Sequence, residues 1–327
     1  MYNIAIVGAT GNVGRNFLSI LEERNFPINE LYLFASKKSN GTYLNFKGKP
    51  YLVQETIEDN IKNKKIDYAL FSAGGETSLI YAPIFTKYGA IVIDNSNAWR
   101  MDENVPLVVP EVNPEDLKNH KGIIANPNCS TIQAMIPLKI LKDNYGLKRV
   151  IYSTYQAVSG AGVGGINDLK NGVSGLPPKK FPYPIFNNCI PQIDVFLDNG
   201  YTKEEIKMIN ETKKILHDNN LKITATTVRV PVLNCHSESI NIELSNNYNI
   251  NDIVDLFNNS EGIIVYDKKE SLKYPMPILV DGKNDVYVGR IRRDFSIENG
   301  LNIWVVADNL RKGASLNAIQ ILETLTK

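Results

Sequence analysis

Residues 4–14 read IAIVGATGNVG, in which a short apolar run is followed by a turn with three glycines, Gly8, Gly11 and Gly14. The run is typical of a buried strand, and the segment after the turn has its apolar residues on one face of a helix. Glycines in such a turn let the backbone bend sharply and approach a pyrophosphate, while the following helix offers its N-terminal N–H groups to the anion. The stretch predicts a dinucleotide-binding unit, with a plain tight turn as the alternative.

Further short apolar runs follow in the first part of the chain, with a helical segment at residues 77–88 between them. They lie at residues 31–34, 68–71, 91–93 and 123–125. Strands that alternate with helices predict a parallel sheet covered by helices on both faces. This part of the chain is therefore expected to be a Rossmann-like α/β domain.

The pattern changes after about residue 126, where longer strand-like segments appear. They lie at residues 150–157, 223–230, 237–244, 287–293 and 301–307, and several alternate polar with apolar residues. A long helix is expected to begin at Thr202, since Glu205 three residues later completes a capping-box signature. The helical segment after Asn309 is expected to return to the first domain. We expect one domain from residues 1–127 and 309–327, and an α+β domain with a mixed sheet from residues 128–308.

The composition points to a small-molecule partner. Among 327 residues, 36 Lys and Arg nearly balance 35 Asp and Glu, which disfavours nucleic acid or an anionic membrane as partner. No segment has the apolar length needed to cross a bilayer, and the first residues do not resemble an export signal. Three cysteines and no zinc-like Cys/His spacing predict neither a disulfide framework nor a metal site. We expect a cytoplasmic protein.

The end of the second predicted strand bears on the choice of cofactor. Rossmann domains that bind NAD usually carry an acidic residue there for the ribose 2′-hydroxyl. Here residues 33–41 read LFASKKSNG, so that Ser36, Lys37, Lys38 and Ser39 supply hydroxyl and ammonium groups suited to a 2′-phosphate. The sequence favours NADP over NAD, and a solvated loop is the alternative.

Cys129 is the candidate nucleophile. It lies in ANPNCSTIQAMIPLKIL, residues 125–141, between a short strand and a helix that we expect to be capped by Ser130 or Thr131. A helix N-terminus stabilises a thiolate, and its N–H groups, with the side chain of Asn128, could receive the oxyanion of a tetrahedral intermediate. An inert, buried cysteine is the interpretation that suits Cys189 and Cys235 better.

A cysteine nucleophile needs a proton-transfer partner, for which His236 is favoured. His120 and His217 lie in polar surroundings and are expected to be exposed. Arg229 lies within a β-branched strand, where an anionic partner is required, and a substrate carboxylate or a structural ion pair fits equally well. Gln156 ends a strand before a Gly-rich loop and could orient a thiolate or thioester carbonyl.

Glu211 and Lys214 lie three residues apart on the long helix. From spacing alone they form a surface pair that contributes little and stays outside the site.

Several blocks taken together resemble the aspartate-β-semialdehyde dehydrogenase family. In chain order they are GATGNVG, SAGG, NPNCSTIQ, STYQAVSGAG, PQIDVF, ETKK, VRVPVLNCHSES, VGRIRRD and WVVADNLRKGA, which cover nearly the whole chain. The resemblance implies reduction of β-aspartyl phosphate by NADPH to the semialdehyde and phosphate, on the route to lysine, threonine and methionine. It also implies that the second domain is catalytic and forms a homodimer.

The resemblance further implies roles for individual residues. Cys129 would be the nucleophile, His236 the acid/base and Gln156 the residue that orients the acyl-enzyme. Arg229 would bind the substrate carboxylate and Glu211 its amino group, which reverses the interpretation of Glu211 and Lys214 from spacing. Arg100, Lys214 and Asn128 would bind phosphate. With the glycine turn and Ser36, the cofactor residues would be Gly8, Thr10, Gly11, Asn12, Val13, Gly14, Ser36, Lys38, Ser39, Ser159, Gly160 and Asn309.

Two other functions remain as alternatives. N-acetyl-glutamyl-phosphate reductase uses the same chemistry on a longer, acylated substrate, so acceptance of only N-acylated substrates would favour it. A regulatory protein that binds NADP without turnover would leave Cys129 unreactive toward iodoacetamide at neutral pH.

Overall fold

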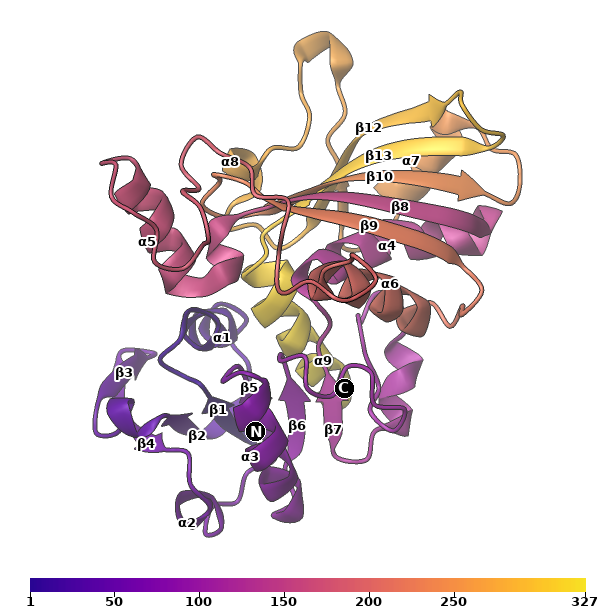
Figure 1. The fold of residues 1–327 in the computed structure, drawn as a ribbon. Coiled ribbons are helices and arrows are strands. Elements are labelled where there is room, and N and C mark those ends of the chain that lie inside the picture. Colours follow the sequence, from indigo (N-terminus) through magenta and orange to yellow (C-terminus); the bar gives the residue numbers. More distant parts are fainter. The chain divides into compact units, whose positions relative to one another are not determined.

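The computed structural model describes residues 1–327, except the side chain of Lys269. The chain folds into two compact units (Figure 1). Unit 1 comprises residues 1–128 and 314–327, and unit 2 comprises residues 129–313. Each unit has its own sheet and is described by itself.

The sheet of unit 1 has seven strands, of which all but the edge strand β3 run parallel to their neighbours. Their order is β3 (Tyr43–Phe46), β4 (Lys49–Glu55), β2 (Ile28–Ala35), β1 (Tyr2–Val7), β5 (Tyr68–Phe71), β6 (Ile91–Asp94) and β7 (Ile123–Ala125). The central strands are buried on both faces and apolar throughout, as a covered parallel sheet requires.

Helices lie on both faces of this sheet. Leu33 and Leu70 pack in one core with Phe17 of α1 (Asn12–Glu23) and Ile319 of α9 (Leu316–Thr326). Their strand neighbours Phe34 and Phe71 face the opposite way and make edge contacts with Phe85 of α3 (Gly75–Lys87). The Rossmann-like fold is confirmed, and the last helix packs in the core of unit 1. Unit 1 also contains α2 (Glu58–Ile61) and the 3-10 helices η1 (Lys37–Ser39) and η2 (Pro114–Asn119).

Unit 2 contains a mixed sheet of six strands (Figure 1). The order is β11 (Ile263–Val265), β12 (Val286–Asp294), β13 (Gly300–Ala307), β10 (His236–Leu244), β8 (Leu147–Gln156) and β9 (Lys222–Arg229). The pairs β8 with β9 and β11 with β12 are parallel, and the other pairs are antiparallel. This sheet confirms the α+β character expected for the second part of the chain.

One face of the mixed sheet is buried beneath helices α4 (Cys129–Tyr145) and α6 (Lys203–Ile215). Along β8, Tyr152, Thr154 and Gln156 are buried, whereas Tyr155 between them is 40% exposed. The hydroxyl of Tyr152 lies 2.9 Å from that of Thr212 on α6, which fixes this helix over the strand. The remaining elements are α5 (Gly162–Gly172), α7 (Ile250–Asn258), α8 (Pro277–Val280), the 3-10 helices η3 (Val158–Ala161) and η4 (Lys269–Ser271), and the π-helix η5 (Arg311–Ser315).

Two local expectations have different outcomes. The capping box of α6 is confirmed, because Thr202 accepts a hydrogen bond from the backbone N–H of Glu205 while the Glu205 carboxylate accepts one from the N–H of Thr202. The expected cap of the cysteine helix is wrong, since α4 begins at Cys129 and Ser130 and Thr131 lie buried in its first turn. Within the part of the chain that is described, no helix combines the length and apolar character needed to cross a membrane.

Candidate active site and nucleotide pocket

The glycine turn of unit 1 is sterically required. Gly8 has φ +85°, and a Cβ atom there would lie 2.3 Å from the carbonyl oxygen of Ser72. A Cβ atom on Gly14 would lie 2.3 Å from the carbonyl oxygen of Gly8. The turn therefore packs directly against β5 and the first turn of α1, and only glycine permits that approach.

A cavity of about 450 Å³ opens beside this turn. It is lined by Gly8, Thr10, Gly11, Ala35, Ser36, Lys37, Glu55, Thr56, Ser72, Ala73, Thr77 and Tyr81. The predicted residue Ser39 contributes indirectly, since its hydroxyl lies 3.3 Å from that of Thr10. Lys37, rather than the predicted Lys38, is among the lining residues. The hydroxyl and ammonium groups beside an exposed α1 N-terminus fit a phosphorylated nucleotide.

Glu55 was not expected in this cavity. It ends β4, a strand missing from the sequence prediction, and β4 places it beside Ala35 at the end of β2. It lines the cavity together with Ser36 and Lys37.

Cys129 begins helix α4 and is partly exposed, as a nucleophile must be. Gly313 of η5 lies against it, and a Cβ atom on Gly313 would be 3.0 Å from the Cβ atom of Cys129. Helices in which a π turn interrupts the regular pattern occur often at functional sites. The cysteine is thus held between the start of α4 and a close backbone approach.

Three predicted site residues lie at neighbouring strand ends on the sheet face that α4 covers. Gln156 is the last residue of β8 and pairs with Arg229, the last residue of β9. His236 is the first residue of β10, which runs antiparallel to β8. Helix α4 is tied to this end of the sheet, since the Gln133 amide donates to the backbone carbonyl of His236 at 3.3 Å. The charge of Cys129 acts on Arg229, which places the sulfur within electrostatic reach of the same cluster.

The backbone determines which nitrogen of His236 carries the hydrogen. The N–H of Ala157 donates to Nδ1 of His236 at 3.0 Å, so Nδ1 is an acceptor and Nε2 carries the hydrogen in the neutral ring. Burial, and then the charge of Arg229, lower the pKa of His236 well below its usual value. Nε2 is itself buried without a hydrogen-bond partner among the described residues. The ring is therefore a neutral Nε2–H donor available to a ligand.

Arg229 is buried and also has donor capacity left. Its Nη1 donates to the carbonyl oxygen of Ala157 at 2.6 Å, and its guanidinium lies 5.9 Å from the ring centre of Phe181. Burial lowers the pKa of Arg229, although the charges of Glu204 and Cys129 oppose the shift. It makes no ion pair among the residues that the structure describes, and its Nε has no acceptor there. Two interpretations of Arg229 were left open, a substrate carboxylate and a structural ion pair. Among the described residues no ion pair with Arg229 is present to support the second.

The loop after β8 passes close to the side chains of Arg229 and His236. A Cβ atom on Gly160 would lie 3.0 Å from Nη1 of Arg229 and 3.2 Å from Nε2 of His236. The neighbouring Ser159 exchanges hydrogen bonds with Asn309 at 3.0 to 3.3 Å. Asn309 also accepts the backbone N–H of Cys235 at 2.9 Å. Three residues expected to bind cofactor, Ser159, Gly160 and Asn309, are therefore brought together beside His236.

Glu211 is only 1% exposed, so the interpretation of Glu211 and Lys214 as a solvated surface pair is wrong. Both residues lie on α6, on the side of the sheet that carries Gln156 and Arg229. Sequence reasoning missed Glu204 in the first turn of the same helix, although it is 5% exposed and contacts Gln156. The position of Glu204 in the sequence did not indicate a role in the site, because acidic residues are common in the first turn of a helix, where they interact with the helix dipole.

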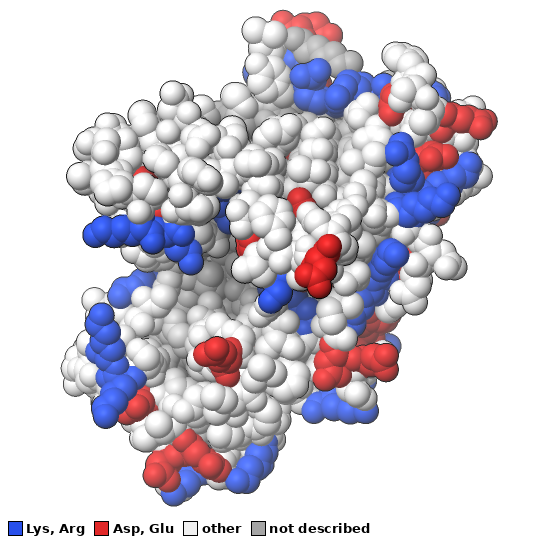
Figure 2. All heavy atoms as spheres, in the orientation of Figure 1, with Lys and Arg blue, Asp and Glu red and all other residues white. Residues whose placement is uncertain are grey.

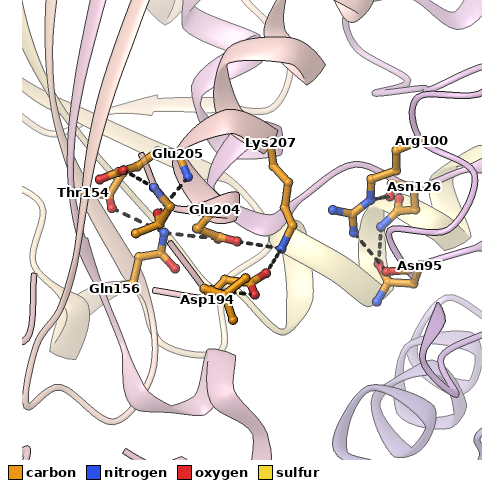
Figure 3. A network of polar contacts seen from close by, with 11 residues as sticks. Asn95, Arg100, Asn126, Thr154, Gln156, Asp194, Glu204, Glu205 and Lys207 are labelled. Carbon is orange, nitrogen blue, oxygen red and sulfur yellow. Dashed lines mark hydrogen bonds and ion pairs between the residues drawn. The ribbon is translucent and has the colours of Figure 1, made fainter. Parts of the chain in front are cut away.

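Arg100 belongs to unit 1, where its guanidinium is anchored by main-chain oxygens. Its Nε donates to the carbonyl of Asn126 at 2.9 Å and its Nη2 to that of Asn95 at 3.1 Å (Figure 3). These acceptors follow strands β7 and β6, so the carboxyl ends of two parallel strands position the cation. Asn128, the residue before Cys129, is also buried.

The remaining histidines and cysteines differ in part from expectation. His217 is exposed as expected, but His120 is partly buried, and its Nδ1 accepts the N–H of Gly122. Cys235 is buried, whereas Cys189 is exposed, so the expectation of a buried thiol fails there. Cys235 lies near Asp281 and Asp308 in a grouping that could hold a cation. Burial, and then these carboxylates, raise the pKa of the Cys235 thiol, which favours its protonated form.

The visible surface agrees with the balanced composition. Figure 2 shows basic and acidic side chains interspersed over the face in view, without an extended area of one sign.

Comparison with protein-family models identifies the class of protein. The semialdehyde dehydrogenase NAD-binding domain matches residues 3–120, and the semialdehyde dehydrogenase dimerisation domain matches residues 138–312. The fold is thus that of a two-domain, nicotinamide-dependent oxidoreductase of the semialdehyde dehydrogenase class.

Individual relatives narrow this class. The aspartate-semialdehyde dehydrogenase of Aquifex aeolicus is 56% identical, with 100% of this chain and 98% of the relative covered. The crystal structure of aspartate semialdehyde dehydrogenase II from Vibrio cholerae complexed with ASA has a TM-score of 0.94 at 44% identity, covering 100% of this chain and 98% of that one. The Candida albicans enzyme with NADP has a TM-score of 0.77 at 26% identity, with the same coverage. The chain belongs to the aspartate-semialdehyde dehydrogenase family, whose members are oxidoreductases of amino-acid biosynthesis, and the resemblance seen in the sequence is confirmed.

Proposed function

We propose that this protein reduces L-aspartyl-4-phosphate with NADPH to L-aspartate-4-semialdehyde and phosphate, through a thioester on Cys129, in lysine, threonine and methionine biosynthesis. The observation that carries the proposal is the cluster at one end of the mixed sheet. It joins a partly exposed thiol at a helix start to a neutral imidazole N–H and a buried guanidinium that has no ion-pair partner among the described residues.

The chemistry assigned to the cluster follows from its donors. The Cys129 thiolate attacks the acyl carbon, and the C–O bond to phosphate breaks as the thioester forms. One proton is taken up overall and ends on the released phosphate. The bound nicotinamide would supply the hydride that reduces the thioester to a hemithioacetal. His236 serves as the acid/base group, and its Nε2–H is the hydrogen offered to the developing oxyanion.

Substrate binding is assigned by charge. Arg229 binds the α-carboxylate, because its Nε–H has no acceptor and no protein carboxylate pairs with it among the described residues. Glu211 receives the amino group, and Arg100, Lys214 and Asn128 bind phosphate. Gln156 orients the acyl group. The Vibrio cholerae structure complexed with ASA supports this substrate class.

NADP is the proposed cofactor. Ser36 and Lys37 line the cavity beside the glycine turn and fit a 2′-phosphate, and the Candida albicans relative was solved with NADP. Gly8, Thr10, Gly11, Asn12, Val13, Gly14, Lys38 and Ser39 complete the proposed site in unit 1, with Ser159, Gly160 and Asn309 in unit 2. We also propose a cytoplasmic homodimer, which the match to a dimerisation domain supports.

The test is phosphate-dependent reduction of NADP by aspartate semialdehyde, the reverse reaction. Wild-type protein should turn over, and Cys129→Ala should abolish turnover while NADP still binds. Turnover of N-acetyl-glutamate semialdehyde alone would favour the reductase alternative, and NADP binding without turnover of either substrate would favour a regulatory protein.

A further inference from the structure

A chain of polar contacts leads from Gln156 into helix α6. The amide nitrogen Nε2 of Gln156 lies 3.4 Å from Oε1 of Glu204 and 3.3 Å from the hydroxyl of Thr154 (Figure 3). Oε2 of Glu204 pairs with Nζ of Lys207 at 3.2 Å, and Lys207 pairs with Asp194 at 2.8 Å. The residue roles implied by the resemblance use none of Glu204, Lys207 and Asp194.

The charged side chains of Glu204, Lys207 and Asp194 stabilise one another by ion pairing. Glu204 is 5% exposed, and a buried carboxylate without a cation would be costly. Lys207 supplies that cation: burial acts to lower its pKa, but the charges of Glu204 and Asp194 outweigh burial and the pKa is raised. The position of Glu204 in the first turn of α6 adds the favourable field of the helix N-terminus.

An ionised carboxylate can only accept hydrogen bonds, whereas the two ends of a carboxamide differ. Glu204 therefore attracts the NH₂ end of Gln156 and repels its carbonyl end. Both contacts of Nε2 are long for hydrogen bonds. The orientation of the Gln156 amide therefore depends more on the charge of Glu204 than on the strength of these two hydrogen bonds. With its amide hydrogens directed to Glu204 and Thr154, Gln156 has only an acceptor to offer elsewhere.

We propose that Glu204, held by Lys207, is a positioning residue that fixes the Gln156 amide with its nitrogen toward α6 and its oxygen toward the acyl group. This inference rests on the proposed function, and it refines the role of Gln156. Gln156 accepts a hydrogen bond from a donor of the substrate or of the hemithioacetal hydroxyl, and does not donate to a thioester carbonyl.

The test is a double-mutant cycle on kcat. Glu204→Gln removes the charge but keeps the size, so the amide orientation becomes mixed and we expect kcat to fall about 10-fold, a loss typical of one misplaced polar group, with a smaller change in KM. In a Gln156→Ala background, Glu204→Gln should change kcat less than 2-fold. Lys207→Met is a second variant in case the first folds poorly, and it should show the same dependence on Gln156.

Glu205 is the matched control on the neighbouring position. Its carboxylate accepts the N–H groups of Thr202 and Thr227 rather than contacting Gln156. Glu205→Gln should therefore lower the melting temperature while leaving kcat near the wild-type value. Equal losses from Glu204→Gln with and without Gln156, or unchanged kcat in the single variant, would overturn the inference. Absence of wild-type turnover would instead overturn the proposed function, and this inference with it.

Discussion

Gly160 lies so close to Arg229 and His236 that its missing side chain is a requirement of the site. In Gly160→Ala the new methyl group would lie 3.0 Å from Arg229 Nη1 and 3.1 Å from His236 Cε1, and both partners are buried. We expect kcat/KM to fall at least about 10-fold, as misplaced catalytic groups do. The control is Gly164→Ala, whose methyl would have atoms of the flexible Lys180 side chain as its nearest neighbours, from 3.3 Å. Equal kinetics in the two variants would contradict the assignment.

The roles of Lys37 and Lys38 in cofactor binding can be distinguished by comparing matched substitutions at the two positions. Lys37 lines the nucleotide cavity and Lys38 does not. Lys37→Glu should lower kcat/KM for NADPH by at least about 10-fold, since a 2′-phosphate would then face a like charge, and should affect NADH far less. Lys38→Glu should have the smaller effect. A larger loss from Lys38→Glu would restore the sequence prediction and remove Lys37 from the site.

At the residue scale, the sequence could identify the groups with unusual local context. Cys129 lies at a strand-to-helix junction, and Arg229 interrupts a β-branched run, so both stand out before any fold is known. Glu204, Glu55 and the burial of Glu211 could not be predicted in this way. Their roles depend on contacts with residues distant in sequence, such as Gln156 at 48 positions from Glu204.

Strand β10 carries a second unusual group, Glu238, two residues after His236 on the same buried face. Neither carboxylate oxygen has a hydrogen-bond partner within the described part of the chain. Burial raises the pKa of Glu238 well above its usual value, the amide of Gln133 opposes the shift, and the charge of Glu204 adds to it. Folding therefore favours the protonated form of Glu238.

This shift predicts how stability depends on pH. A carboxyl whose pKa is raised on folding contributes stability that is fully present below the unfolded pKa of about 4.5 and is lost as pH rises. Glu238→Gln lacks this loss, so its advantage over wild type should grow with pH, with a limiting slope of about 1.4 kcal/mol per pH unit. The lowered pKa of His236 has the opposite effect, a loss of stability as pH falls below about 6.5. Because His236 is present in both wild type and Glu238→Gln, its contribution cancels in the difference between them. Denaturant unfolding at pH 5.5, 7 and 8.5 tests this, and parallel stability profiles would contradict it.

Elements with a clear apolar or capping pattern in the local sequence were predictable. Strands that exist only through pairing with another strand were not. The apolar runs of β1, β5 and β6 and the capping box of α6 have local signals. The β3–β4 hairpin has a Pro at position 50 and few buried residues, so its identity as a pair of strands depends on edge pairing with β2. That hairpin places Glu55 in the nucleotide cavity, and the cavity lining could not be predicted without it.

At the scale of the whole molecule, the proposed homodimer can be tested on the second face of the mixed sheet. Tyr155 is 40% exposed there, and its ring centre lies 5.5 Å from that of Trp304 in a tilted contact, an arrangement suited to an apolar interface. Wild type should have twice the 36.6 kDa chain mass by light scattering, and Tyr155→Glu should shift the mass toward the monomer. Tyr43→Glu, at an exposed tyrosine of β3, is the control and should leave the mass unchanged. A monomeric wild type would contradict the proposal.

The whole account depends on covalent chemistry at Cys129, and acyl-enzyme trapping tests it most directly. Protein mixed with aspartyl phosphate without NADPH, quenched in acid and digested, is analysed by mass spectrometry. We predict an aspartyl adduct on the peptide that contains Cys129, absent from Cys129→Ala and absent from the peptide that contains the exposed Cys189. Full turnover without an adduct at Cys129, or an adduct on Cys189 alone, would contradict the account.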